Sequence, residues 1–256
     1  MNVQSLPIEL HSQIFDHLDH SSLLTLLLVS SDFNREAERR LYHAITLVAR
    51  KEQRVKVLGQ LSQVDRVGVY VHTLDLGNFG DASSDNLKCI VASYANMPNL
   101  RFLSLPRSFD PSIIPPPTVP FRLFSFHIRP SGDSIDQLIA VQIFLESQND
   151  MVEFLTFQTK IRPISPNALP NLRIVHAYPE VLVALVPGRA VTHLYLYVQQ
   201  HDSVPERMDA RALKSLSLAD IQTLDFFQMY LPALEYLELG IVRSPRCNYT
   251  LKPDSL

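Results

Sequence analysis

Residues 6–47 read LPIELHSQIFDHLDHSSLLTLLLVSSDFNREAERRLYHAITL, and this stretch predicts three short helices in close succession. Pro7 suits the first turn of a helix, where its missing N–H costs nothing. Leu10, Ile14 and Leu18 then follow at intervals of four, which places them along one helical face. The stretch therefore opens with an amphipathic helix.

The second and third helices are predicted from their capping residues. The first helix is expected to stop near Asp19, and the second to begin within 19–22, where the residues suit an amino-terminal cap. The third is expected to have Ser31 as its cap, with Asp32 in the first turn and the basic pair at 39–40 in the last. These charges agree with the helix dipole at both ends.

The second of these helices is apolar nearly all round. From Leu23 to Val29 every residue except Thr25 is apolar, whereas a three-helix unit of about 45 residues can cover only one side of such a helix. The uncovered side must meet either the rest of this chain or a separate protein, because contiguous exposed apolar surface marks interaction sites.

The ordered string of residues 6–47 resembles an F-box. The family pattern is Leu-Pro-x-Glu-Leu, then a spaced Ile and Leu, then a leucine-rich helix that leads into Val-Ser-x-x-Phe. The matching positions in this chain are Leu6, Pro7, Glu9, Leu10, Ile14, Leu18, Leu23, Leu26, Val29, Ser30 and Phe33. The terminal LYHAITL is similar to the ending common in fungal members, so the resemblance covers about forty residues.

The resemblance implies that this unit binds the Skp-type adaptor of a cullin-RING ubiquitin ligase. It implies that Leu6 and Pro7 insert at the interface with that adaptor, and that other apolar residues divide between the interface and the core of the unit. Where many relatives have tryptophan, the third helix has Phe33. The candidate adaptor-binding residues are Leu6, Pro7, Glu9, Leu10, Ile14, Leu18, Leu23, Leu26, Val29 and Phe33.

Behind a polar helical connector, residues 48–70, short strand-like phrases recur along the chain. They are VHTLDLGN (71–78), NLRFLSLP (99–106), FRLFSFHI (121–128), MVEFLTFQ (151–158), NLRIVHAY (171–178), VTHLYLYV (191–198), LKSLSLAD (213–220) and LEYLELGI (234–241). Their expected inward anchors are Leu74, Leu103, Phe124, Leu155, Val175, Leu194, Leu216 and Leu237. Most of the spacings between anchors fall in the range of about 20 to 29 residues that is typical of leucine-rich repeats.

Helical stretches at 83–97, 134–148, 179–186 and 220–230 separate the phrases. Strand and helix in alternation predict an α/β fold, a three-helix F-box followed by a leucine-rich-repeat solenoid arc with parallel strands. The expected organisation is an F-box at 1–47, the connector at 48–70, divergent repeats at 71–241 and a tail at 242–256 that covers the last strand or marks a shortened chain. The proline-rich insertion at 106–121 is expected to be a stiff surface loop.

Alternation along the strands predicts a concave recognition face. Neighbouring strand side chains point to opposite sides of a sheet, so the residues beside each anchor should face the concave side. That set is Thr73, Asp75, Phe102, Ser104, Phe154, Thr156, His193, Tyr195, Tyr197, Tyr236 and Glu238. The candidate client-binding residues are Phe102, His193, Tyr195, Tyr197 and Tyr236, although strands favour tyrosine even where nothing binds.

Composition excludes several classes of function. The net charge of −3, with both signs mixed along the chain, gives no field for nucleic acid, and no apolar run approaches the ~20 residues that span a bilayer. Cys89 and Cys247 have no metal-ligand spacing, and His11, His17 and His20 do not share one helical face. We expect no metal and no cofactor, and a cytoplasmic or nuclear location without a secretory signal.

Three hypotheses of function follow. The first is a substrate-recognition adaptor of a cullin-RING (SCF-type) E3 ubiquitin ligase, whose repeats hold an unknown client protein while other subunits transfer ubiquitin. The second is an F-box scaffold or regulatory protein that acts without ubiquitination. The third is an enzyme with its active site in the repeat arc or in the proline-rich insertion. No nucleophile or phosphate-loop motif favours the enzyme, so we expect no catalysis by this chain.

Overall fold

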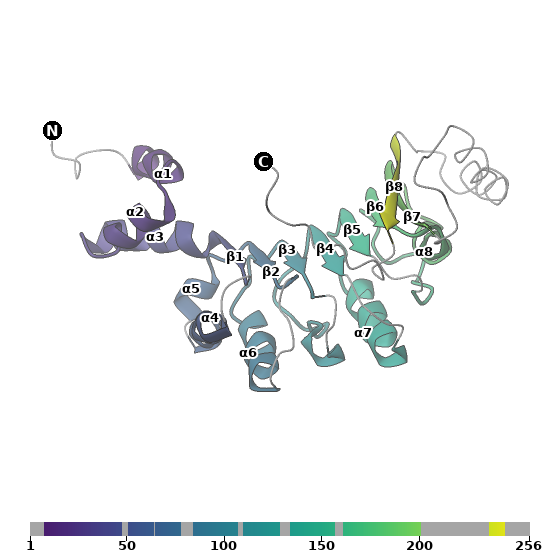
Figure 1. Ribbon diagram of the computed structural model, residues 1–256, viewed down its shortest axis with the longest axis horizontal. Coiled ribbons are helices and arrows are strands. Elements are labelled where there is room, and N and C mark those ends of the chain that lie inside the picture. The colour runs from purple at the N-terminus through teal and green to yellow at the C-terminus, as the bar shows by residue number, and fades with distance from the viewer. Residues whose placement is uncertain are drawn as a thin grey trace.

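The computed structural model describes residues 8–47, 51–63, 65–77, 84–106, 110–128, 134–156, 161–200 and 236–243. Three helices, α1 (Ile8–Asp16), α2 (His20–Leu26) and α3 (Ser31–His43), precede a parallel sheet whose described strands lie side by side in chain order (Figure 1). The strands are β1 (Ala44–Thr46), β2 (Thr73–Asp75), β3 (Phe102–Ser104), β4 (Ser125–Ile128), β5 (Glu153–Thr156), β6 (Ile174–Ala177), β7 (His193–Gln200) and β8 (Tyr236–Arg243).

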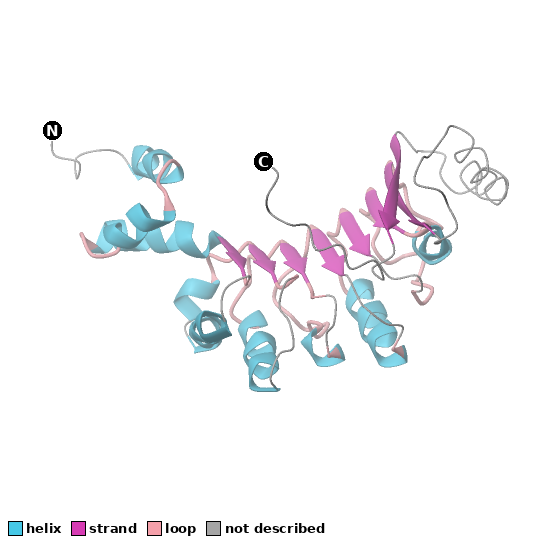
Figure 2. Cartoon of the chain, in the orientation of Figure 1, coloured by secondary structure: helices cyan, strands magenta, loops and turns pink. Residues whose placement is uncertain are grey.

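Helical segments connect the strands and lie on one side of the sheet, as Figure 2 shows. A parallel pair of strands needs such a crossover connection, because the chain must return to the end of the sheet at which the first strand began before the next strand can run in the same direction. These segments are α4 (Lys51–Gln63), α5 (Asp65–Gly68), α6 (Ser84–Tyr94), the 3-10 helix η2 (Pro111–Ile113), α7 (Ile135–Glu146) and α8 (Pro179–Leu185). The predicted α/β arrangement is confirmed; the predicted strand at 213–220 and helix at 220–230 lie outside the described residues.

Side-chain caps fix where two of the amino-terminal helices begin. Asp19 caps α2, since its carboxylate accepts a hydrogen bond from the backbone N–H of Ser22 at 2.8 Å. The cap of α3 is Ser30 and not Ser31 as predicted, because the Ser30 hydroxyl accepts from the backbone N–H of Phe33 at 3.2 Å. Ser30 and Ser31 are both residue types that cap helices. Ser30 is the cap because it lies three residues before the backbone N–H of Phe33, one of the first-turn donors that a helix cannot satisfy with its own carbonyls.

The sheet begins earlier than the sequence predicted. The segment 44–46, placed inside the helical F-box, forms β1 and pairs in parallel with β2, so that Ile45 lies beside Leu74. The first strand was expected only at 71. Three residues give one buried side chain between two exposed ones, which is too short a pattern to be detected as a strand.

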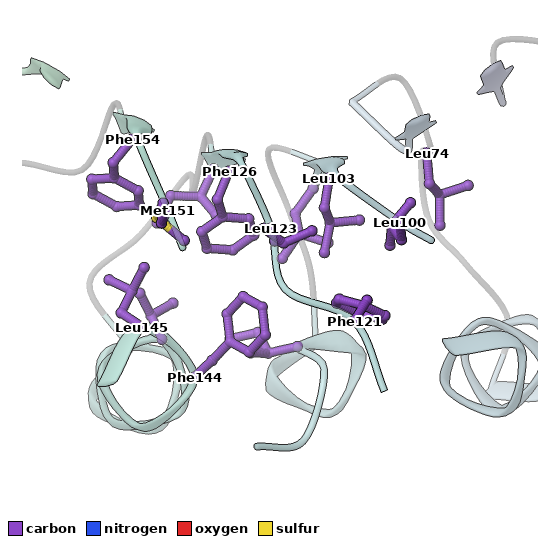
Figure 3. Close-up of a cluster of buried hydrophobic side chains, with 14 of the residues drawn as sticks. Leu74, Leu100, Leu103, Phe121, Leu123, Phe126, Phe144, Leu145, Met151 and Phe154 are labelled. Carbon is purple, nitrogen blue, oxygen red and sulfur yellow. The ribbon is translucent and has the colours of Figure 1, made fainter. Parts of the chain in front are cut away.

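The strand register places one buried side chain of each strand in a continuous column. This column is Ile45, Leu74, Leu103, Phe126, Phe154, Val175 and Leu194. Figure 3 shows Leu74, Leu103, Phe126 and Phe154 pointing from their strands toward the helical layer. The predicted anchors Leu74, Leu103, Val175 and Leu194 are confirmed, and Leu237 pairs with Leu194 as predicted.

Two predicted anchors, Phe124 and Leu155, are wrong. The column uses Phe126 and Phe154, and Phe124 lies before β4 with its ring 41 % exposed. The phrases 121–128 and 151–158 carry apolar residues at both odd and even positions, so alternation alone could not fix which set points inward.

The shift in register moves two predicted recognition residues into the core. Phe154 and Thr156 are fully buried, whereas both were expected on the recognition face. The ring of Phe154 stacks on Phe126 at a centroid distance of 6.0 Å, and Phe126 meets Phe144 of α7 edge-on at 5.1 Å. These three rings join two strands to one helix in the centre of the core.

The described part of the proline-rich insertion, residues 110–121, contributes apolar side chains to the core, which corrects its prediction as a surface loop. Its apolar residues Ile113, Val119 and Phe121 are buried, and η2 lies between α6 and α7 in the helical layer. The prolines prevent regular helix, but the apolar residues between them still pack on the strands.

Loss of one buried hydrogen bond tests this packing. Tyr94 of α6 is buried, and its hydroxyl donates to the backbone carbonyl of Ile113 at 2.9 Å. Replacing Tyr94 with phenylalanine should lower the free energy of unfolding by about 1 to 2 kcal/mol, because the carbonyl would be buried without a partner. Urea denaturation measures the change. The control is Tyr42→Phe, which removes a bond to Gln60 in an exposed setting and should cost less than about 0.5 kcal/mol; equal losses would contradict the prediction.

Candidate docking surfaces

The three amino-terminal helices form a small core of their own. Phe15, Leu23 and Ala37 are buried together, and the rings of Phe15 and Phe33 meet edge-on at 5.7 Å. This cluster is distinct from the long core beneath the sheet. A unit with so few buried side chains leaves much of its own apolar surface uncovered.

Among the side chains of this unit that the structure describes, five large apolar ones are exposed to solvent. They are Leu10, Ile14, Leu24, Leu28 and Val29, with exposed fractions from 43 % at Leu10 to 89 % at Leu28. We call them the apolar set. The sequence left open whether the surplus apolar surface would be hidden beneath the strands or left for another protein. For these five residues the surface is open.

The structure divides the predicted adaptor-binding residues into groups. Leu10, Ile14 and Val29 are exposed, Leu18, Leu26 and Phe33 are half-buried around the small core, and Leu23 is buried within it. Glu9 lies in α1, where its side chain is not described, and Leu6 and Pro7 lie outside the described residues.

Sequence reasoning missed two members of the apolar set, Leu24 and Leu28. The run LLTLLLV contains leucine at nearly every position, so it carries no signal for which leucines face outward. The turn that follows α2 decides the matter, because Asn34 donates from Nδ2 to the carbonyl of Leu27 at 2.9 Å and fixes that turn against α3.

Charged side chains clamp α1 to α3. Ser12 donates to Oε1 of Glu36 at 3.0 Å, Arg39 pairs with the same carboxylate, and Arg40 pairs with Asp16. Burial raises the pKa of Glu36, but hydrogen bonds from Arg39 and Ser12 outweigh it and hold that pKa below its ordinary value. The clamp therefore stays ionised at neutral pH and presents Leu10 and Ile14, four residues apart, on one side of α1.

A hollow of about 540 Å³ lies beside Leu28, between the turn after α2, α3 and the segment of α5 that ends near Tyr70. Its lining includes the apolar Leu27 and Leu28 together with polar groups of Asn34, Arg35 and Tyr70. It is open to solvent and adjoins one member of the apolar set. A protein that covers Leu28 would meet this mixed surface as well.

The second surface is the face of the sheet away from the helices, which we call the open face. Figure 1 shows the connecting helices α4, α6 and α7 below the row of strands and this face above it. Of the predicted client-binding residues, Phe102, His193 and Tyr195 hold open-face positions, the first of them 41 % exposed. Tyr197 and Tyr236 lie in β7 and β8, where side chains are not described.

Three open-face residues that the sequence did not predict form a polar cluster. Oε1 of Glu153 lies 3.2 Å from Nε2 of His176 and 3.7 Å from Nε2 of His127. The ring of His176 stacks on Tyr195 at 4.0 Å with an interplanar angle of 2°. The cluster is explained by the corrected register. Because Phe154 is the inward residue of β5, its neighbour Glu153 faces the open side, between His127 and His176.

Ser125 also contacts His127, but the geometry is not that of a serine nucleophile. The Ser125 hydroxyl lies 3.0 Å from Nε2 of His127, the same nitrogen that faces Glu153. A nucleophilic triad needs the hydroxyl and the carboxylate at opposite nitrogens of the ring, so that the proton can pass through it. Ser125, His127 and Glu153 therefore form a polar network on the open face.

Glu153 gives this network a pH dependence. Hydrogen bonds to His127 and His176 outweigh burial and hold the pKa of Glu153 well below its ordinary value. A carboxyl whose pKa is lower when folded contributes stability that is fully present above the unfolded pKa, about 4.3, and that is lost progressively as the pH falls from there through the lower folded pKa. Glu153→Gln should therefore lower the free energy of unfolding by about 1 to 2 kcal/mol at pH 7.

Denaturation curves at pH 7 and at about pH 3 check this, since the gap between the two proteins should narrow in acid, where residue 153 takes up a proton in the unfolded wild type while the folded carboxylate stays ionised. Glu146→Gln is the control, because Glu146 is an exposed carboxylate on α7 and its loss should change little at either pH. A gap between wild type and Glu153→Gln that is the same size at both pH values would contradict the assignment.

Within the described ranges, no group of three or more histidine, cysteine, aspartate or glutamate side chains is placed to hold a metal ion. The helices of the same ranges include none with both the length and the apolar character of a membrane span. The described surfaces are thus of two kinds, an apolar set on helices and an aromatic and polar face on strands.

Comparison with known protein families gives a match at the amino-terminal helices. Residues 3–48 match the family described as F-box-like. This range contains α1, α2, α3, β1 and the whole apolar set. No curated protein matches the chain.

Proposed function

We propose that this chain is the substrate-recognition adaptor of a cullin-RING (SCF-type) ubiquitin ligase. The observation that carries the proposal is the apolar set, which lies exposed on the same residues that match the F-box-like family. In the proposed complex a Skp-type adaptor covers Leu10, Ile14 and their neighbours. Burying such side chains in an interface is favourable, because burial removes their apolar area from water.

We further propose that the sheet and its helices are a divergent leucine-rich-repeat solenoid that holds a client protein. Two features support this assignment. Each strand pairs with the next in chain order, and successive members of the buried column are separated by 19 to 29 residues. The open face then offers aromatic side chains on rigid strands, which suits recognition at small entropic cost.

The proposed contribution to catalysis is positional. A ligase adaptor holds the client lysine near the charged conjugating enzyme and so raises their effective concentration, while other subunits carry the reacting groups. The chain would then need no nucleophile of its own.

Purification of the tagged full chain, expressed together with a Skp-type adaptor and a cullin, tests the proposal. An equimolar complex of all three proteins is the expected result. Recovery of the adaptor without cullin would favour the alternative, an F-box scaffold or regulatory protein that acts without ubiquitination. Failure to recover the adaptor would contradict both.

A further inference from the structure

A hollow of about 340 Å³ indents the open face over β2, β3 and β4. It lies away from the helices and from the apolar set. Its wall includes a carboxylate, an aromatic ring and several hydroxyls. The side chains that line it are Thr73, Asp75, Phe102, Ser104, Ser125 and His127.

The carboxylate of Asp75 is held in a fixed position but is not neutralised. The backbone N–H of Gly77 donates to its Oδ1 at 2.8 Å. A side chain at residue 77 would crowd this contact, since a Cβ there would lie 2.9 Å from the same oxygen. Among the described residues Asp75 has no ion-pair partner, so its charge faces the hollow without compensation.

The ring of Phe102 forms an apolar wall of the hollow. It is 41 % exposed and packs against Phe124, with the two ring centroids 5.7 Å apart. Phe124 is exposed to the same extent but does not line the hollow. An exposed aromatic face beside a carboxylate suits a cation that carries apolar methylenes.

Apart from its histidines, the described part of the open face carries only acidic charged side chains. Its positions on β1 to β7 include two carboxylates, Asp75 and Glu153, and neither lysine nor arginine, although the chain has 23 of these basic residues. Glu153 already contacts two histidines, so Asp75 supplies the uncompensated charge. Complementary charge favours a basic partner and disfavours an acidic one.

We infer that the hollow is a subsite for a basic side chain, arginine or lysine, of the client protein. The charge of that side chain would pair with Asp75, and its methylenes and cationic head would lie against the ring of Phe102. This inference rests on the proposed function, because it names the chemistry of the client at the face that the ligase would present.

The test uses N-acetyl-arginine methylamide as the probe, titrated into the full chain with labelled phenylalanine rings and followed by NMR. N-acetyl-citrulline methylamide is the matched probe, since it keeps the shape of arginine but not the charge. The arginine probe should bind about fivefold more tightly than the citrulline probe, the ratio expected for one partly exposed ion pair with a cation–π contact. Rising salt should reduce that ratio.

Variants assign the binding to the hollow. Asp75→Asn keeps the oxygen that accepts from Gly77 but removes the charge, and it should abolish the preference for arginine. Asp136→Asn removes a charge from α7 on the helical side and should leave the preference unchanged. Phe102→Leu should weaken binding about threefold, whereas Ile143→Ala, which removes an exposed apolar side chain from α7 on the helical side, should not.

Equal binding of the two probes, a preference that survives Asp75→Asn, or no saturable binding would overturn the inference. Capture of the Skp-type adaptor by the same Asp75→Asn protein is measured in parallel. If the wild-type chain captures the Skp-type adaptor but shows no preference for the arginine probe, the subsite is wrong and the proposed ligase role stands. If the wild-type chain does not capture the adaptor, the proposed role itself is contradicted.

Discussion

Replacement of Ile14 by aspartate should reduce capture of the Skp-type adaptor by on the order of 100-fold, equivalent to about 3 kcal/mol of binding free energy. Ile14 lies on α1 with 46 % of its side chain exposed, one turn after Leu10. In the proposed complex it is buried against the adaptor, and a carboxylate at that place would be desolvated without a partner. The affinity is measured with purified full-length chain and adaptor.

The same substitution should leave the free protein folded, because the site is open to solvent and outside the small core. Ile143→Asp is the matched control, since Ile143 on α7 is 49 % exposed and lies far from the apolar set along the chain. The free energy of unfolding of both variants should lie within about 0.5 kcal/mol of the wild-type value. Undiminished capture by a folded Ile14→Asp protein would remove the main support for the ligase role.

The largest effect on stability is expected from Phe126→Ala. The side chain is fully buried and contacts the rings of both Phe144 and Phe154. Its truncation should lower the free energy of unfolding by about 3 to 5 kcal/mol, because it removes apolar area from the core and leaves a cavity that two aromatic rings cannot close. Urea denaturation followed by circular dichroism measures the change.

Phe124→Ala is the decisive comparison. Phe124 is two residues away and 41 % exposed, so its loss should cost less than about 1 kcal/mol. The sequence-based register assigned the inward position to Phe124 and therefore expects the opposite order of effects. A larger loss for Phe124→Ala than for Phe126→Ala would show that the strand register is wrong.

The sequence predicted the structure best where residues have one strong structural preference, such as helix capping. Asp19 was expected at the start of the second helix and is its cap. The helical stretches at 83–97 and 134–148 were predicted from their length and composition, and they contain α6 and α7. The F-box resemblance rested on an ordered string, and a family match at 3–48 agrees with it.

Prediction failed where apolar residues are in surplus. At 121–128 and 151–158 both faces of the strand carry apolar residues, and only the neighbouring strands select which face is buried. That selection placed Glu153 on the open face, so its contacts with two histidines could not be foreseen. The proline-rich segment was predicted to lie on the surface because of its prolines. Its isoleucines and Phe121 are buried instead and pack into the core.

The junction between the helical unit and the sheet has no flexible linker. α3 ends at His43 and β1 begins at Ala44, Tyr42 packs against the long core, and Arg66 of α5 pairs with Glu38 of α3 at 2.5 Å. A client held on the strands would thus sit at a set distance and angle from the ligase core. If the proposed ligase role holds, this fixed geometry would select among client lysines by their position, so moving the acceptor lysine on a client should abolish modification even with its binding segment intact.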